Sequence, residues 1–308
     1  LIDRVDTGPY YSPPVIVRQM IRRSFVQSVC YHLDEELSAS AKAWLWGETA
    51  SSDLLQSREF SKIQTILAEM KILDPAAGSG AYLVGVAEEL ARLRVKWMLD
   101  VQSNGEEGMF HVLHHIVKSN LYGVDLNEEA ILLTRVRLWL WLMHQLRTFT
   151  PMPPLQLNII SGDSVSGLDV QFNRLVWDPQ HPLSGVETLL AMHNQYLQSS
   201  IHERSEVERL FYETLRTIKS QIGIEESEPG IIYQLQFPSI FRSPRPGFSI
   251  VLANPPYVRA EYLPEEYKAL LQHRFNNDLF QPLSSTTDLY CAFFAKSFRL
   301  LEAGGVQA

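Results

Sequence analysis

The chain has 308 residues, of which 45% are hydrophobic and 20% are charged, so it can bury a full core and is neither disordered nor fibrous. Its two cysteines, Cys30 and Cys291, exclude a disulfide framework or a cysteine-rich metal site. A net charge of −8 is the wrong sign for a surface that binds nucleic acid unaided. Because no basic-then-apolar leader indicates secretion, we expect a cytoplasmic globular protein.

The first 70 residues are predicted to form a helical segment. A Tyr-Tyr-Ser-Pro-Pro motif covers residues 10–14, and hydrophobic residues then recur at helical spacing from Val15 to Phe25. A polar, serine-rich stretch follows at residues 51–61.

A glycine-rich loop follows at residues 74–80, between an apolar run and a helical pattern. This order is typical of a strand, a tight turn and a helix. Gly78 and Gly80 permit positive φ and a close backbone approach, and the N–H groups at the helix start can face a ligand. The third glycine of the dinucleotide-binding fingerprint is missing, so that site is not predicted. Alone, the loop is equally consistent with a tight turn.

Two further strands are predicted to end on carboxylates. Asp125 ends the run of residues 120–125 and can accept from paired ribose hydroxyls. Asp163 follows the apolar run 155–160 and can accept from an adenine amino group. The alternative for either residue is an N-cap of the next helix. Between the first two strands we expect helices at 83–99 and 110–117, separated by a loop at 102–108.

Two features between residues 111 and 146 could suggest a metal site or a membrane span, but the residues fit neither. His111 and His115 are four residues apart, yet no matching carboxylate motif accompanies them, so no metal site is expected. The apolar helix predicted at 131–146 contains Arg135 and Arg137, which indicates a packed helix rather than a membrane span.

Residues 165–247 are too long for an ordinary connection. Their apolar positions suggest two amphipathic helices, and the residues on which this rests are Leu189, Met192, Tyr196, Leu210, Phe211 and Leu215. The insertion can serve as a DNA clamp, a docking surface or scaffold. Arg242, Arg245 and Arg259 near the next strand can contact phosphates or simply face solvent.

The sequence Asn-Pro-Pro-Tyr at residues 254–257 ends another apolar run, residues 248–253. An amino group conjugated to a ring or carbonyl is a poor nucleophile, because its lone pair is delocalised. The Asn254 side-chain oxygen and the Pro255 carbonyl can accept its two hydrogens and localise that lone pair. The Tyr257 ring can stack on the substrate and attract the developing positive charge. The motif therefore predicts methylation of a planar nitrogen, with a strand-ending turn as the structural alternative.

These motifs, in this order, resemble those of the N6-adenine-specific DNA methyltransferases, in particular those of fused single-chain restriction-modification enzymes and phage-defence methylases. The family has a Tyr-Thr-Pro-Pro-like segment, an Asp-Pro-Ala-x-Gly-Ser-Gly loop, and Gly-Val-Asp, Gly-Asp and Asn-Pro-Pro-Tyr elements. Here Ser12 replaces the threonine and keeps the hydroxyl. A later helix of the family resembles residues 288–296, where Phe293 best fits the aromatic beside the cofactor adenine, with core packing as the alternative.

The resemblance spans most of the chain and implies an α/β fold: a Rossmann-like methyltransferase sheet with an N-terminal helical segment and a helical insertion. It also implies S-adenosyl-L-methionine as cofactor, with no metal. The loop 74–80 and Ser12 would lie near the methionine part, Asp125 at the ribose and Asp163 at the adenine. The cofactor-binding residues implied are Tyr11, Ser12, Asp74, Pro75, Ala76, Gly78, Ser79, Gly80, Asp125, Leu126, Asp163, Ser164 and Phe293.

By the same resemblance, Asn254, Pro255 and Pro256 form the catalytic loop, and Tyr257 stacks on an adenine flipped out of double-stranded DNA. The partners implied are DNA, bound through a recognition domain outside this sequence, and nuclease or defence-system subunits. The alternatives are a glutamine methyltransferase of the release-factor type, an RNA base methyltransferase and a non-catalytic scaffold with the same fold.

We expect a division into residues 1–70, 71–164, 165–247 and 248–308, the last containing the catalytic strand and the helix that follows. Residues 299–305 are typical of a helix end with a glycine cap, and residues 306–308 resemble the start of another strand. We therefore expect an excerpt of a longer polypeptide whose sheet continues.

Overall fold

The computed structural model describes residues 12–47, 58–101, 105–168, 185–224, 230–275, 284 and 286–308. Tyr10 and Tyr11 lie outside these residues. Within them, five strands form one sheet of order β3-β2-β1-β4-β5, in which every neighbouring pair is parallel. The strands are β1 (Ile72–Asp74), β2 (Leu121–Asp125), β3 (Ile159–Ser161), β4 (Phe248–Val251) and β5 (Leu301–Gln307).

The strand order reverses direction at β1. The chain adds β2 and β3 on one side of this strand and places β4 and β5 on the other. Rossmann-like sheets have this order, and ligands bind at their reversal point, beyond the carboxyl ends of the strands. The loops after β1 and β4 therefore lie side by side, and the Rossmann-like sheet expected from sequence is confirmed.

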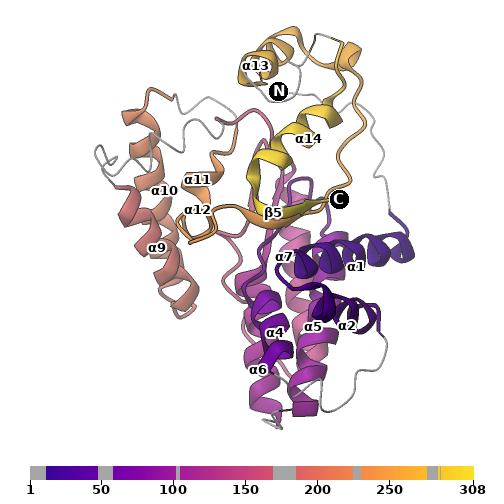
Figure 1. Cartoon of the computed structure of the whole chain (residues 1–308). Helices are drawn as coiled ribbons and strands as arrows, with labels where there is room; N and C mark the ends of the chain where they lie inside the picture. The colour runs from indigo at the N-terminus through magenta and orange to yellow at the C-terminus, as the bar shows by residue number, and fades with distance from the viewer. Residues whose placement is uncertain are drawn as a thin grey trace.

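Helices cover one face of the sheet, around a large apolar cluster that includes Ile72, Leu121 and Ile250. In Figure 1 they gather below and beside the sheet. They are α1 (Pro14–Tyr31), α2 (Glu35–Trp46), α4 (Arg58–Glu69), α5 (Ala81–Val101), α6 (Gly105–His115) and α7 (Glu128–Leu146). None of the described helices is long and apolar enough to cross a membrane.

The opposite face packs against α11 (Tyr233–Gln236), α12 (Pro238–Phe241) and the end of α14 (Leu289–Leu300). Strand residues alternate between the two faces, as the pleat requires. Phe248 and Ile250 are the exception, because an irregularity in β4 lies between them. Phe248 therefore packs on the face covered by α11 and α12, and Ile250 packs on the opposite face.

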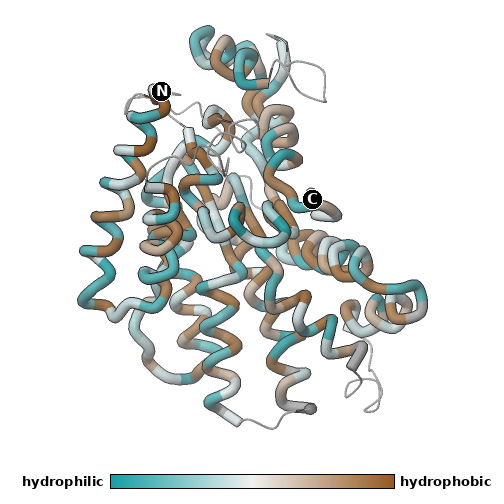
Figure 2. Tube along the Cα trace, turned by 60° about the vertical axis from the view of Figure 1, so that its left-hand side comes forward, coloured by the Kyte–Doolittle hydropathy of each residue, from teal (hydrophilic) through white to brown (hydrophobic). Residues whose placement is uncertain are grey.

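The two amphipathic helices predicted within residues 165–247 are present as α9 (Val186–Gln198) and α10 (Arg204–Gln221). They share a separate apolar cluster with Leu157 and Ile232. Along the tube in Figure 2, hydrophobic and hydrophilic residues alternate on the helices, as amphipathic packing requires.

Two predicted boundaries are wrong. Helix α14 ends at Leu300, and Gly304 and Gly305 lie within β5 rather than in a helix cap. The strand therefore begins before Val306. The loop predicted at 102–108 is also shorter, since α6 begins at Gly105 and continues into the π-helix η1 (Ile116–Asn120).

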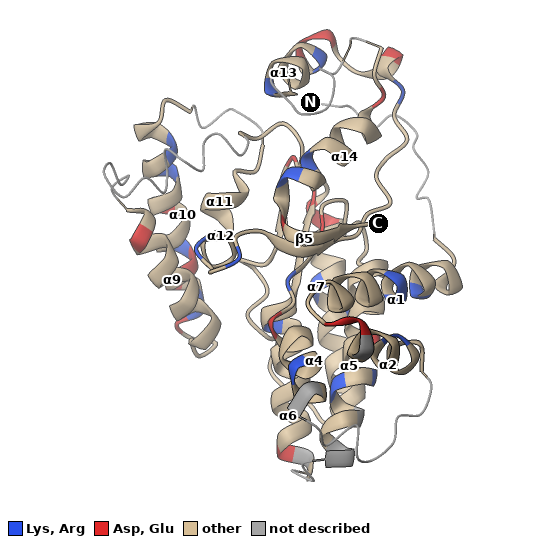
Figure 3. Ribbon diagram, viewed as in Figure 1, with Lys and Arg blue, Asp and Glu red and all other residues tan. Residues whose placement is uncertain are grey.

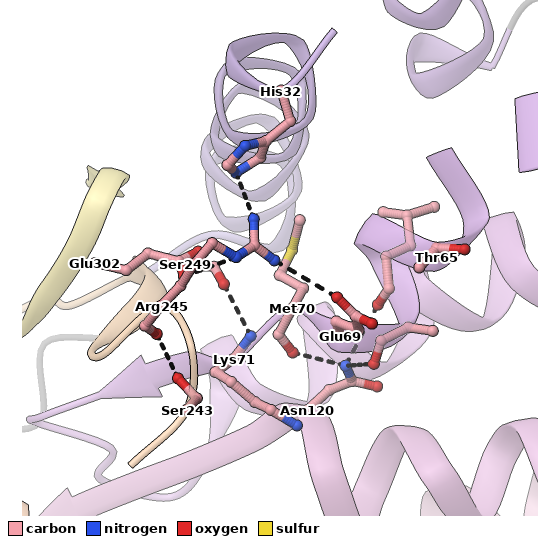
Figure 4. Close-up of polar contacts among 12 residues, drawn as sticks. His32, Thr65, Glu69, Met70, Lys71, Asn120, Ser243, Arg245, Ser249 and Glu302 are labelled. Carbon is pink, nitrogen blue, oxygen red and sulfur yellow. Dashed lines mark hydrogen bonds and ion pairs between the residues drawn. The ribbon is translucent and has the colours of Figure 1, made fainter. Parts of the chain in front are cut away.

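Buried polar groups fix the amino-terminal ends of the strands (Figure 4). The Asn120 amide nitrogen donates to the carbonyls of Leu67, Ala68 and Met70, which satisfies groups at the end of α4. Its oxygen accepts from Arg94 at 3.2 Å. Asn120 therefore joins α4, α5 and β2 through one fully buried side chain.

Arg245 forms a second hub just before β4. Its guanidinium lies 3.6 Å from Glu69 and from Glu302, and it contacts His32 at 3.0 Å. Burial, followed by the Arg245 charge, lowers the pKa of His32, so the neutral ring can accept from this arginine. Arg242 pairs with Glu187, and Arg259 lies 3.6 Å from Glu261. All three arginines thus have carboxylate partners within the protein.

Replacing Asn120 with alanine should destabilise the protein by roughly 2–3 kcal/mol, because buried carbonyls and Arg94 lose their partner. Urea unfolding of the variant and the wild type measures this difference. Asn194→Ala is the matched control, since Asn194 is exposed on α9 and its replacement should change stability by no more than about 0.5 kcal/mol. Equal effects of the two substitutions would contradict the role assigned to Asn120.

Candidate functional site

The loop after β1 forms the base of the site. Gly78 and Gly80 have φ of +50° and +81°, as the sequence predicts. At Gly80 a Cβ would meet Thr134 at 2.7 Å, so this glycine serves helix packing. Among the described residues, a Cβ at Gly78 would meet nothing nearer than the Ala76 carbonyl at 4.0 Å, so this part of the chain leaves open space over the loop.

Four N–H groups of this loop form hydrogen bonds within the protein. Those of Ala76 and Gly78 donate to Asp74 Oδ1 and Asp125 Oδ2, at 3.0 and 2.8 Å. Those of Ala77 and Gly80 donate to backbone carbonyls. The loop is therefore held rigid by its own donors. On its outer side, Arg137 donates to the Ser79 carbonyl at 2.7 Å.

Asp125 lies at the end of β2, beside this loop. Besides Gly78, it accepts from the Asn127 N–H, through Oδ1, at 2.9 Å. Asn127, not Asp125, is the N-cap of α7, so the capping alternative does not hold here. A carboxylate has about four acceptor positions, so Asp125 retains capacity for ligand hydroxyls. The neighbouring Leu126 side chain is 61% exposed.

Asp163 and Ser164 follow β3 and lie against the same loop. Asp163 Oδ1 accepts from the N–H groups of Val165 and Ser166, at 2.9 and 3.2 Å, as a cap of a local turn would. The Ser164 hydroxyl donates to the Pro75 carbonyl at 2.5 Å. Ser164 therefore joins two strand ends rather than presenting its hydrogen to a ligand.

Phe293 of α14 is only 9% exposed and packs in an apolar cluster with Val165 and Ala76. This cluster reaches both the Gly-rich loop and the loop carrying Asp163. Core packing, the alternative weighed from sequence, is thus observed, and it occurs at the edge of the site.

The Asn-Pro-Pro-Tyr segment leaves β4 beside these elements. The Asn254 Nδ2 donates to Ser12 Oγ at 3.1 Å, and the Tyr82 hydroxyl contacts the same oxygen at 3.2 Å. Because Ser12 receives the nitrogen end of the amide, the oxygen end of Asn254 points away from it. Tyr257 is 56% exposed, and its ring centroid lies 6.4 Å from that of Tyr290.

Asp74 is the most deeply buried carboxyl of the site, with 1% of its surface exposed. Burial raises its pKa to about 8 from an ordinary 3.8, and the nearby Asp125 acts in the same direction. The Ala76 N–H opposes the shift but does not overcome it. Burial therefore favours the protonated form of this acid.

Two tyrosines of the site carried no motif in the sequence. Tyr82 lies in the first turn of α5 and contacts Ser12, while Tyr267 of α13 (Glu265–Phe275) contacts Asp163. In the sequence, only the position of Tyr82 just after the glycine loop could have indicated that it belongs to the site. Among the described residues, no group of histidine, cysteine and acidic side chains is arranged to hold a metal, and His115 instead contacts Arg94.

Two protein families match the chain. The Eco57I restriction-modification methylase family matches residues 119–308, and the MmeI DNA-methyltransferase domain matches residues 50–152. The putative type II restriction enzyme and methyltransferase RM.MjaORFECS2P of Methanocaldococcus jannaschii is 33% identical over 177 residues, which are 52% of this chain and 14% of that protein.

Among solved structures, the Type IIL restriction-modification enzyme MmeI in complex with DNA aligns with a TM-score of 0.47 and 14% identity, over 94% of this chain and 28% of that one. The chain thus spans 14% and 28% of the lengths of these two relatives. The first family match covers more than half of the residues. The chain therefore belongs to the Eco57I restriction-modification methylase family.

Proposed function

We propose that this chain is the catalytic part of an enzyme that transfers a methyl group from S-adenosyl-L-methionine to the N6 amine of adenine in DNA. Membership of a restriction-modification methylase family supports DNA methylation as the reaction class. The choice of the adenine amine rests on the residues at the end of β4.

The observation that carries the proposal is the orientation of Asn254. Its amide nitrogen donates to Ser12, so the oxygen is the end of the amide that faces away from Ser12, and we infer that this oxygen accepts a hydrogen from the substrate amine. An acceptor fixed in advance stabilises the positive charge that develops on the nitrogen as the methyl group arrives. The Pro255 carbonyl would accept the second hydrogen, Pro256 would keep the turn rigid, and the exposed Tyr257 ring would stack on the flipped adenine.

The residues around the Gly-rich loop fit the cofactor. The space over Gly78 is open, Asp125 keeps acceptor capacity for ribose hydroxyls, and Leu126 exposes an apolar side chain beside it. Asp163 would accept from the adenine amino group, next to Phe293, and Asp74 to Gly80, with Ser12, would adjoin the methionine part. When bound, S-adenosyl-L-methionine supplies the methyl group on a positively charged sulfur.

DNA is the proposed partner, although this chain is acidic. Lys and Arg residues are spread over several elements, among them α1, α4 and α10 (Figure 3). We propose that a recognition domain elsewhere in the protein contributes most DNA contacts, and that a nuclease or defence subunit acts with it. The much greater length of both relatives supports this division.

The same proposal assigns roles to the segments of the chain. Residues 1–70 would supply Ser12, residues 71–164 the cofactor site, residues 165–247 a mainly structural insertion and residues 248–308 the catalytic loop. Arg242 supports a structural role for the insertion, because it pairs with Glu187 of α9. Neither family match favours the glutamine or RNA methyltransferase alternatives.

Expression of the full-length protein in a host free of DNA methylation tests the substrate directly. We expect N6-methyladenine at one recurring sequence when the genome is mapped base by base, and none with Asn254→Ala. Methylation at cytosine, or an unmodified genome from a folded, cofactor-binding protein, would contradict the proposed substrate.

Asn254→Ala and Asp125→Ala should separate catalysis from cofactor binding. Loss of the Asn254 acceptor should slow transfer by about 100-fold or more, with little change in cofactor affinity. Asp125→Ala should weaken cofactor binding, because it removes the ribose acceptor and the Gly78 N–H partner. Single-turnover rates and calorimetric affinities measure the two effects. Equal losses of affinity in both variants would refute this assignment of roles.

Asp74→Asn should change how stability depends on pH. With a folded pKa of about 8 against an ordinary 3.8, the native protein keeps a proton that the unfolded chain releases. The stability contributed by Asp74 therefore falls as pH rises from about 4 to about 8, and no further above that. Relative to wild type, the asparagine variant should gain up to about 1.4 kcal/mol per pH unit within this window. Urea unfolding without ligand measures this, and a constant difference between pH 5 and 8 would contradict it.

A further inference from the structure

One face of helix α13 covers the loop that follows β3. The Tyr267 hydroxyl donates to Asp163 Oδ2 at 2.8 Å, and Arg274 Nε donates to the Ser166 carbonyl at 3.0 Å. Because an α-helix has 3.6 residues per turn, these two side chains lie about two turns apart on the same face. Leu271, between them in the sequence, is buried in the apolar cluster that contains Phe293.

Helix α14 holds the same loop from a second direction. The buried Lys296 Nζ donates to the carbonyls of Gly167 and Leu168, at 2.8 and 3.0 Å. Arg299 of α14 donates to the Arg274 carbonyl at 3.3 Å, which ties the two helices together. The loop after β3 is therefore fixed by charged donors from both helices.

The Asp163 carboxylate is oriented from both of its ends. Its Oδ1 accepts hydrogen bonds from two backbone N–H groups of its own loop, and its Oδ2 accepts one from the Tyr267 hydroxyl. Burial, followed by the negative charge of Asp163, raises the pKa of Tyr267, so the phenol stays protonated and remains a donor. A carboxylate oxygen can accept a second hydrogen bond, so Oδ2 can serve Tyr267 and a ligand together.

We propose that Tyr267 is a positioning residue that aims Asp163 Oδ2 at the adenine amino group of the cofactor, so that α13 forms one wall of the cofactor site. This inference rests on the proposed function. It also assigns a specificity: Asp163 accepts but does not donate, so a purine with an amino group at position 6 gains a hydrogen bond that an unsubstituted purine lacks. Tyr267 contributes to affinity only through that bond.

The test compares two ligands and two tyrosines in the full-length protein. S-adenosylhomocysteine and its analogue with unsubstituted purine in place of adenine are titrated calorimetrically into wild type, Tyr267→Phe and Tyr262→Phe. We expect Tyr267→Phe to weaken S-adenosylhomocysteine binding by about 3- to 10-fold, the worth of one hydrogen bond, and to leave analogue binding within about 2-fold. Tyr262 is the matched control, because its side chain is 57% exposed and its hydroxyl should affect neither ligand.

The outcomes distinguish failure of this inference from failure of the proposed function. Equal weakening of both ligands by Tyr267→Phe would mean that α13 only supports the fold, and unchanged binding of both would mean that Tyr267 does not orient Asp163. Either result overturns the inference and leaves the methyltransferase assignment standing. Failure of the folded wild-type protein to bind S-adenosylhomocysteine would instead overturn the cofactor assignment, and with it the role of Tyr267.

Discussion

The parallel pairing of β1 with β4 is the constraint on which the rest of the site depends. Lys71 and Ser249 are 178 residues apart, yet the Ser249 hydroxyl accepts from the Lys71 N–H at 3.1 Å. The Lys71 carbonyl accepts from both Ser249 and Ile250 across the bulge. Because a slip of one residue would turn every β4 side chain to the opposite face, these bonds fix both the core and the exit point of the chain. They deliver Asn254 to the strand end next to Asp74.

The polar groups at these strand ends stabilise the loops before they contact any ligand. Asp125 and Asp163 each hold backbone N–H groups of neighbouring turns, and Ser164 joins the loops after β1 and β3. Such groups are pre-organised, so ligand binding costs little further ordering. Asp74 differs from these groups, because its burial raises its pKa and destabilises its charged form. A positively charged ligand beside this carboxyl would favour the ionised form.

The sequence predicted the fold well because its signals were local. Apolar runs that end in Gly-rich, Gly-Val-Asp, Gly-Asp and Asn-Pro-Pro-Tyr segments indicated four strand ends, and helical spacing indicated α9 and α10. The Tyr267 contact with Asp163 and the Arg245 hub were not predictable, because each joins residues far apart in the chain and depends on tertiary packing. The prediction of a helix cap at Gly304 and Gly305 was wrong for the same reason. Pairing with β4 makes this segment a strand, although the local pattern is that of a helix end.

The loop that carries Asn254 to Tyr257 and the loop that carries Asp163 share one support. The Asp288 carboxylate accepts from the Ala260 N–H at 2.9 Å, and the Leu289 N–H donates to Val258 at 3.0 Å, so the start of α14 holds the chain that leaves Tyr257. Further along the same helix, Lys296 holds the loop after Asp163. A helix of this length moves largely as a rigid body, so any displacement of α14 acts on both loops together. A ligand that shifted α14 at one of these loops would therefore also act on the other, and such an effect would be reciprocal.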